Sequence, residues 1–197
     1  MRGGVGYLAA VLALAAGAAS AQAPDWREAR GQLFETEGTS VEVLGYDFLT
    51  EQDRAIIGEV ARQQDYYGAV ALSPDEGLMS EATVAGANHH SIPAAEAQAL
   101  AACNGRRAEG ARACVVVAHV LPQGYEARPL QLSKAATAAA GTTYREARAP
   151  KAMAISPATG GWTVARGGDS GPAAIASCNE EALERGGVED CAVAIED

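Results

Sequence analysis

The residues of this chain that are candidates for nucleophilic catalysis or metal binding are one serine in a glycine-rich turn and three histidines. Ser170 lies in the sequence GGDSGP, residues 167–172, and the histidines are His89, His90 and His119. A serine hydroxyl attacks a carbonyl carbon only when a base, usually histidine, accepts its proton and an acid orients that base. Ser170 with one of the three histidines is therefore a candidate serine hydrolase site.

GGDSGP resembles GDSGGP, the nucleophile sequence of the trypsin-like serine proteases, but the rest of that pattern is missing. The chain contains no Thr-Ala-Ala-His-Cys sequence, its motif lacks one glycine, and the GxSxG nucleophile elbow is not matched. Ser170 also aligns with Ser91 in an internal repeat, and no protease motif surrounds Ser91. We therefore interpret both serines as helix N-caps, with Asp169 adding favourable negative charge near a helix N-terminus.

His89 and His90 are a candidate metal half-site. Adjacent residues of an extended chain point to opposite sides, so one ion contacts both rings only if they lie in an irregular loop. Carboxylates occur nearby in the sequence without a recognisable ligand spacing, and the alternative is an exposed pair of loop histidines. His119 alternates with valines in CVVVAHVL and is expected in a strand with its ring hydrogen-bonded.

Three aromatic residues are candidates for a binding surface at the hairpins. They are Tyr66, Tyr67 and Trp162. The sequence leaves two alternatives open, because the same rings also serve as packing anchors in small proteins.

Two segments of the second part of the chain are similar to each other and indicate a repeat. The first is residues 66–121 and the second is residues 151–197. In each, a strand of alternating small and apolar residues ends in Ser-Pro, a second extended run follows, and a helix opens with Ser and with Pro in its first turn. A cysteine-led strand closes each copy, so the predicted unit is strand, strand, helix, strand.

The four cysteines are predicted to form one disulfide within each repeat. Four cysteines allow three pairings, and the repeat selects Cys103 with Cys114 and Cys178 with Cys191. Each bond joins the late part of a helix to the start of the next strand. The alternative, a four-cysteine zinc site, lacks the CxxC spacing that such sites use.

At these residues the chain resembles a family of small secreted bacterial domains of unknown function. The family pattern is Tyr-Gly-Ala-Ile-Ala, then Ser, then an Ala-rich helix carrying Ala-Leu-x-x-Cys, and a second Cys before a Val-rich strand. The first copy fits at residues 67–73, at Ala99-Leu100, and at Cys103 and Cys114. The second copy departs, with Lys151-Ala152 in place of Tyr-Gly and no Leu before Cys178. The resemblance implies a stapled secreted module and supplies no catalytic residue.

The remaining segments are predicted to be helical or connecting. Residues 1–21 have the basic start, apolar run and Ala-Ser-Ala ending of a secretory signal peptide. Residues 22–65 form an N-terminal helical segment with one short strand and a helix capped by Thr50, in which Ile56, Ile57 and Val60 face inward. Residues 122–150 form a linker with an Ala-rich helix capped by Ser133. The predicted fold is α+β, with the two ββαβ units forming one antiparallel-rich sheet and the helices on one face.

Composition narrows the classes of function. The chain has a formal net charge of −10, which disfavours nucleic acid and anionic lipid as partners, and only 5% aromatic residues. We expect no cofactor and no membrane insertion after signal cleavage. The leading hypothesis is a secreted or periplasmic non-catalytic binding or interaction module for a protein or envelope ligand. The alternatives are a serine hydrolase that uses Ser170 and a metal-binding envelope protein that uses His89 and His90.

Overall fold

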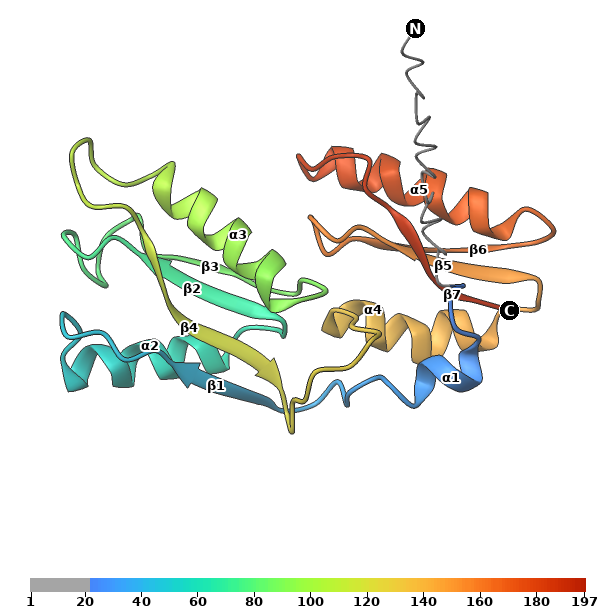
Figure 1. Cartoon of the computed structure of the whole chain (residues 1–197), viewed down its shortest axis with the longest axis horizontal. Helices are drawn as coiled ribbons and strands as arrows, with labels where there is room; N and C mark the ends of the chain where they lie inside the picture. Colours follow the sequence, from blue (N-terminus) through green and yellow to red (C-terminus); the bar gives the residue numbers. More distant parts are fainter. Residues whose placement is uncertain (1–21) are drawn as a thin grey trace, which may run out of the picture.

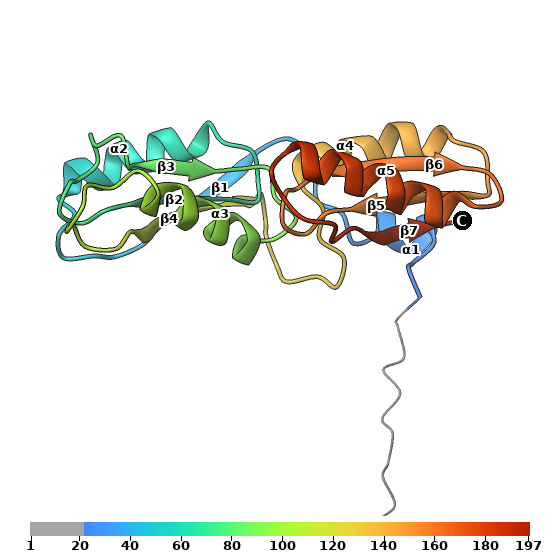
Figure 2. The same ribbon diagram turned by 90° about the horizontal axis from the view of Figure 1, so that it is seen from above.

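The protein is an α+β structure with two separate antiparallel sheets, one in each half of an elongated molecule. The computed structural model describes residues 22–197, so the predicted signal peptide, residues 1–21, lies outside the described residues. Figure 1 shows one sheet at each end of the molecule, and Figure 2 shows the two parts end to end. We call them the first lobe and the second lobe.

The first lobe contains a four-stranded sheet in the order β1-β4-β2-β3, with every neighbouring pair antiparallel. Its strands are β1 (Thr39–Val43), β2 (Gly68–Leu72), β3 (Val84–Gly86) and β4 (Val115–Pro122). Helix α3 (Ile92–Asn104) covers one face, and helix α2 (Glu51–Arg62) covers the other (Figure 1).

The second lobe contains a three-stranded sheet in the order β6-β5-β7, also antiparallel. Its strands are β5 (Lys151–Ile155), β6 (Trp162–Arg166) and β7 (Ala192–Glu196). Helix α5 (Ser170–Glu184) covers one face. On the other face lie α1 (Trp26–Arg30) and a continuous helix made of α4 (Lys134–Ala139) and the π-helical turn η1 (Ala140–Tyr144).

The prediction of one sheet with helices on one face is wrong in both respects. Strand β2 of the first lobe and strand β5 of the second lobe are buried on both faces. In each of them the smaller side chains lie on one face and the larger side chains on the other. In β2, Ala69 and Ala71 face α3, whereas Val70 and Leu72 face α2. In β5, alanines 152 and 154 pack against α5, and Met153 packs against the α4 side. A strand with no polar face needs cover on both sides, and one helix covers only one of them.

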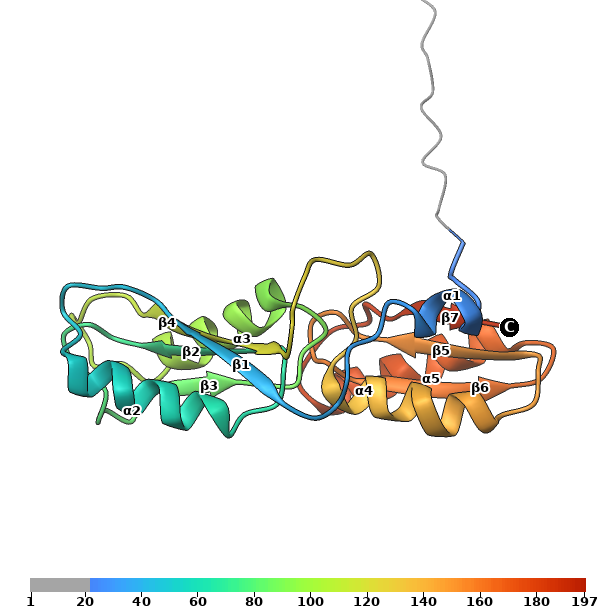
Figure 3. The ribbon, with the colours of Figure 1, turned by 90° about the horizontal axis from the view of Figure 1, so that it is seen from below.

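The segments expected to be peripheral supply these additional layers. Residues 22–65 are divided between the lobes, because β1 and α2 belong to the first and α1 packs on the second, where Glu196 N–H donates to Pro24 O at 3.1 Å. Residues 122–150, expected to be a linker, contain the helix that underlies the second sheet. The chain therefore crosses between the lobes twice, from α1 to β1 and from β4 to α4 (Figure 3).

Three predicted helix starts are confirmed. Thr50 forms a capping box with Asp53, and the side chains of Ser91 and Ser133 accept hydrogen bonds from the backbone N–H of Ala94 and Ala136. The predicted inward face of α2 is only partly correct. Ile57 is buried, but Ile56 and Val60 are exposed to 38% and 45%.

Both predicted disulfides are present, Cys103–Cys114 and Cys178–Cys191. Each joins the disulfide-bearing helix of its lobe, α3 or α5, to the following strand. The residue after the first cysteine reinforces the link in both lobes. Asn104 Oδ1 accepts from Cys114 N–H at 3.1 Å, and Asn179 Oδ1 accepts from Cys191 N–H at 3.0 Å. Within residues 22–197, no helix is long and apolar enough to cross a membrane.

Candidate functional site

Ser170 is not placed as either interpretation required. Helix α5 begins at Ser170 itself, its N-cap is Asp169, and no side chain makes a capping hydrogen bond. The prediction that Ser170 is the N-cap is therefore wrong. The helix starts one residue earlier relative to its proline than α3 does, which places Ser170 inside the first turn, where it is only 3% exposed.

The structure does not bring a histidine to Ser170. The residue lies at the end of α5 that is farther from the first lobe (Figure 1). His119 lies on β4 of the first lobe, where its Nε2 is 2.7 Å from Glu96 Oε1 and its Nδ1 is 3.6 Å from Glu42 Oε2. The expectation of a strand histidine with a hydrogen-bonded ring is thus confirmed. The other two histidines lie between the lobes.

Of the three aromatic residues for which a binding surface and packing anchors were the open alternatives, two are packing anchors. Tyr66 and Tyr67 are fully buried, so the interpretation of these two rings as an exposed surface is wrong. Their rings contact each other edge to face, and Tyr67 also contacts Tyr125. Trp162 is half-buried against the core beneath the second sheet. Burial raises the pKa of Tyr66 and of Tyr67, which keeps both phenols protonated.

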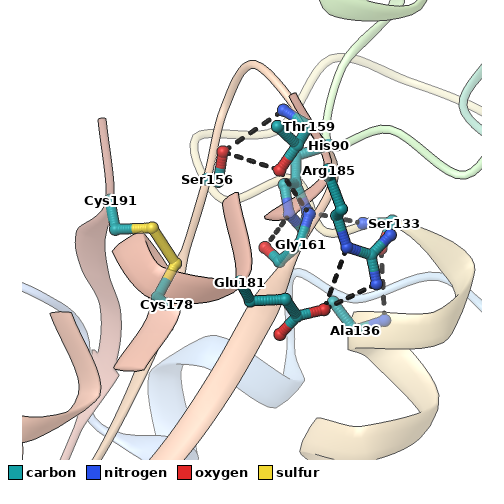
Figure 4. Close-up of polar contacts among 10 residues, drawn as sticks. All are labelled: His90, Ser133, Ala136, Ser156, Thr159, Gly161, Cys178, Glu181, Arg185 and Cys191. Atoms are coloured by element: carbon teal, nitrogen blue, oxygen red, sulfur yellow. Dashed lines mark hydrogen bonds and ion pairs between the residues drawn. A yellow bond between two sulfur atoms is a disulfide. The ribbon is translucent and has the colours of Figure 1, made fainter. Parts of the chain in front are cut away.

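His90 joins the two lobes. The backbone N–H of Ser133 donates to His90 Nδ1 at 3.0 Å, and His90 Nε2 donates to the carbonyl of Gly161 at 3.0 Å (Figure 4). This arrangement fixes the neutral tautomer with its proton on Nε2. Burial lowers the pKa of His90 to about 4, although the hydrogen bond to Gly161 opposes the shift. The ring is therefore uncharged at neutral pH.

Further contacts surround His90 and complete the lobe junction. The Asn88 side chain accepts from Ala135 N–H at 3.0 Å, and Lys134 Nζ lies 2.7 Å from Asp65 Oδ1. Gly160, with a φ of +71°, approaches the backbone of Asn88 so closely that a Cβ atom would overlap its carbonyl oxygen. The turn before β6 and the N-terminus of α4 thus both rest on the loop that follows β3.

A cavity of about 630 Å³, which we call the junction cleft, opens beside these contacts. Its volume is within the range of small-ligand sites. One wall comes from β3, α3 and the loop after β3, and the other from the turn before β6 and the C-terminal end of α5. It is lined by Ala85, Gly86, Ala87, His89, Ala94, Ala97, Gln98, Ala158, Thr159, Arg185, Gly186 and Gly187.

His89 is the buried polar side chain of the junction cleft. It is 5% exposed, its Nδ1 atom is buried without a hydrogen-bond partner, and burial lowers its pKa. A buried polar atom without a partner is unusual and costs about 1–3 kcal/mol. His89 lines the cleft, and its other ring nitrogen, Nε2, is not among the enclosed atoms without a partner. His89 therefore presents an uncharged ring to the cleft at neutral pH.

The opposite wall holds the basic group of the cleft. Arg185 Nε and Nη2 lie 3.0 and 2.5 Å from Glu181 Oε1, which holds the guanidinium from one side (Figure 4). Exposed Leu183 and Val188 flank this part of the chain. Sequence reasoning missed Arg185 and Gly160. The Gly160-Gly161 and Gly186-Gly187 pairs were the available signals, since paired glycines mark turns and close approaches.

A second cavity, of about 640 Å³, lies against His90 and Arg128. Its wall includes Gln22 and Ala23, which directly follow the residues that the structure does not describe. The junction cleft, in contrast, is lined only by residues well inside the described range, and we therefore take it as the candidate site.

The histidine pair is not arranged as two ligands of one metal ion. Both ring nitrogens of His90 already have backbone partners, so an ion would have to displace one of them. Within the part of the chain that the structure describes, no three His, Cys, Asp or Glu side chains are grouped to hold a metal.

Comparisons with known proteins give no match to this chain. No protein-family model, no curated protein and no solved structure is similar to it.

Proposed function

We propose that this protein is an exported, non-catalytic binding module and that the junction cleft is its ligand site. The observation that carries the proposal is the buried His89 ring in the wall of the cleft, with Nδ1 unpaired and Nε2 left for a partner. Sites that recognise small molecules combine apolar walls with a few oriented polar groups. The cleft is lined by alanine and glycine together with the polar side chains of His89, Gln98, Thr159 and Arg185. Ser170, in contrast, has no basic partner in the hydrogen bonds of residues 22–197.

Export to an oxidising compartment is supported by the two disulfides and by the sequence of residues 1–21. Disulfides persist in secreted and periplasmic proteins and are rare in the cytosol. The segment before Gln22 has the pattern of a signal peptide. The partner we propose is accordingly a protein or another envelope component.

We also propose that the lobes are two copies of one unit, as the resemblance to the family of secreted domains implies. Three features support this. The sheet orders β3-β2-β4 and β6-β5-β7 correspond, the central strands carry register shifts at Val70/Ala71 and Met153/Ala154, and the Cys-Asn pair recurs at 103–104 and 178–179. In the complete unit a helix precedes the first strand, so α2 corresponds to α4.

Capture experiments with a blocked cleft test the binding function. Ala97 is exposed on the cleft wall, and Ala97→Trp fills the cleft without entering a core. Ala101→Trp is the matched control, since this exposed alanine lies one turn farther along α3 and does not line the cleft. Envelope components captured by the unmodified protein, identified by mass spectrometry, should be lost with Ala97→Trp and retained with Ala101→Trp. Equal capture by both variants would contradict the proposal.

A reactivity test separates binding from hydrolysis. A fluorophosphonate probe labels activated serines covalently. We expect no labelling of the purified protein, because Ser170 has no histidine partner. Labelling that disappears in Ser170→Ala would establish the serine hydrolase alternative instead.

A further inference from the structure

We propose that the junction cleft binds an extended peptide segment of a partner protein, which adds as a further strand to the free edge of β3. The inference rests on the proposed binding function and specifies the chemistry of the ligand. In this mode of recognition, main-chain hydrogen bonds supply affinity and the flanking surface supplies selectivity.

The first observation is the position of β3 in its sheet. Among the described residues, β3 pairs only with β2, so its outer backbone edge has no strand partner. The last residues of this edge, Ala85 and Gly86, together with Ala87 line the cleft. The edge therefore opens directly into the candidate site.

The second observation is that β3, a strand of three residues, carries none of the charged residues found on the other sheet edges. Edge strands commonly carry charged residues that prevent pairing with another chain. Strands β1, β6 and β7 contain Glu42, Arg166 and Glu196, respectively, whereas β3 has the sequence VAG. Of the four edge strands within residues 22–197, only β3 is uncharged. Its edge therefore has no charged side chain to oppose an added strand.

The third observation is the small size of the cleft-lining side chains. Eight of the twelve lining residues are alanine or glycine. Such walls allow a peptide backbone to approach closely, and they leave little bulk to hold an aromatic or branched small molecule.

The charged and polar groups of the cleft indicate an acidic peptide. Arg185 is the one charged residue that lines it, and no Asp or Glu does so among the described residues, although the chain carries 25 acidic against 15 basic residues. Glu181 contacts Nε and Nη2 of Arg185, which leaves Nη1 for a ligand. His89 lies in the same cleft, with Nε2 left for a partner. A peptide carboxylate is the complementary group.

The test is selection of random octapeptides displayed on phage against the purified, disulfide-bonded protein. We expect enriched peptides that contain Asp or Glu. Synthetic versions should bind Ala97→Trp at least tenfold more weakly than the unmodified protein and Ala101→Trp with unchanged affinity. Methylation of alternate backbone nitrogens in the peptide should also weaken binding at least tenfold, because a methylated nitrogen donates no hydrogen bond. Failure to enrich peptides, or equal binding of methylated peptides, would overturn the inference.

Charge recognition is tested separately with variants that do not affect a core. Replacing the peptide carboxylate by an amide should weaken binding about fivefold or more. The difference should disappear in Arg185→Gln and persist in Arg106→Gln, an exposed arginine outside the cleft. An unchanged difference in Arg185→Gln would overturn this assignment. If envelope capture depends on the cleft but no peptide is enriched, the binding function stands and the peptide ligand is refuted.

Discussion

His90 shows how one buried side chain links three segments of this protein. Its two ring nitrogens have opposite roles, one accepting from Ser133 N–H and the other donating to Gly161 O. A protonated imidazole has two donors and no acceptor. Protonation would therefore set two N–H groups against each other at Nδ1 of a ring that is only 4% exposed. The neutral ring is a condition of the lobe contact.

This arrangement predicts that the protein loses stability in acid. The pKa of His90 is about 4 in the folded protein against an ordinary value of 6.5, so the unfolded chain takes up the proton first. The contribution of His90 is fully present above pH 6.5 and falls by roughly 3 kcal/mol as the pH decreases to about 4. Burial lowers the pKa of His89 as well, which acts in the same direction.

Urea unfolding between pH 7.5 and 4 measures this loss. His90→Gln is the matched variant, because an amide both accepts and donates a hydrogen bond but does not titrate in this range. We expect a clearly smaller loss of stability for His90→Gln over the same pH interval. The same dependence in both proteins would show that other groups cause it.

At the level of single residues, the sequence predicted local contacts better than distant ones. The cysteine pairs and the caps at Thr50 and Ser133 depend on near neighbours, and all are present. The N-cap prediction at Ser170 was wrong because α5 begins one residue earlier relative to its proline than α3 does. Arg185 was missed because its importance depends on the first lobe, far away in sequence.

The disulfide-bearing helices are each held to the next strand by two links of different chemistry. In α3, Cys103 bonds to Cys114, and Asn104 accepts a hydrogen bond from the backbone of the same Cys114. In α5, Cys178 and Asn179 do the same at Cys191. Asn104 thus orients the start of β4, and Asn179 orients the start of β7. Strand β4 pairs with β2, and β7 pairs with β5.

Replacement of the asparagines should therefore destabilise both lobes. Asn104→Ala leaves Cys114 N–H without its partner, and Asn179→Ala does the same at Cys191. We expect each change to cost about 1 kcal/mol in the free energy of unfolding, measured in urea with the disulfides intact. Leu183→Ala, at an exposed position on α5, is a control expected to stay within about 0.5 kcal/mol. Loss of less than the control value would contradict a structural role for the asparagines.

At the level of elements, strand and helix types were predictable, but the layers were not. The alternation in β2 and β5 indicated strands, and both are strands. The larger residues of these strands, such as Leu72 and Met153, lie on the face that was predicted to have no helix, and sequence alone does not say which segment covers it. Helices α2 and α4 supply this layer, although they belong to segments that were predicted to be an N-terminal segment and a linker.

At the level of the whole molecule, the relative position of the two lobes depends on the contacts of the lobe junction. In both lobes the disulfide-bearing helix lies on the same side of its sheet (Figure 1). The turn between β5 and β6 of the second lobe meets the loop that follows β3 of the first lobe. Gly160 in that turn lies against the backbone of Asn88, and the neighbouring Gly161 accepts from His90. The junction also forms both walls of the cleft, so the ligand binding that we propose depends on its integrity.

Gly160→Ala should open the junction. The residue has a positive φ of +71°, which costs an alanine about 1–2 kcal/mol, and a Cβ atom would overlap the Asn88 carbonyl, a backbone atom that cannot turn away. Gly124→Ala is the matched control, because Gly124 has a φ of +69° and a Cβ atom added there would have nothing within 4 Å. Both variants carry the backbone cost, but only Gly160→Ala carries the clash. We therefore expect Gly160→Ala to lose more stability and, by small-angle X-ray scattering, to show a larger radius of gyration with unchanged far-ultraviolet circular dichroism. Equal stability and equal dimensions in the two variants would show that the lobes do not depend on this contact.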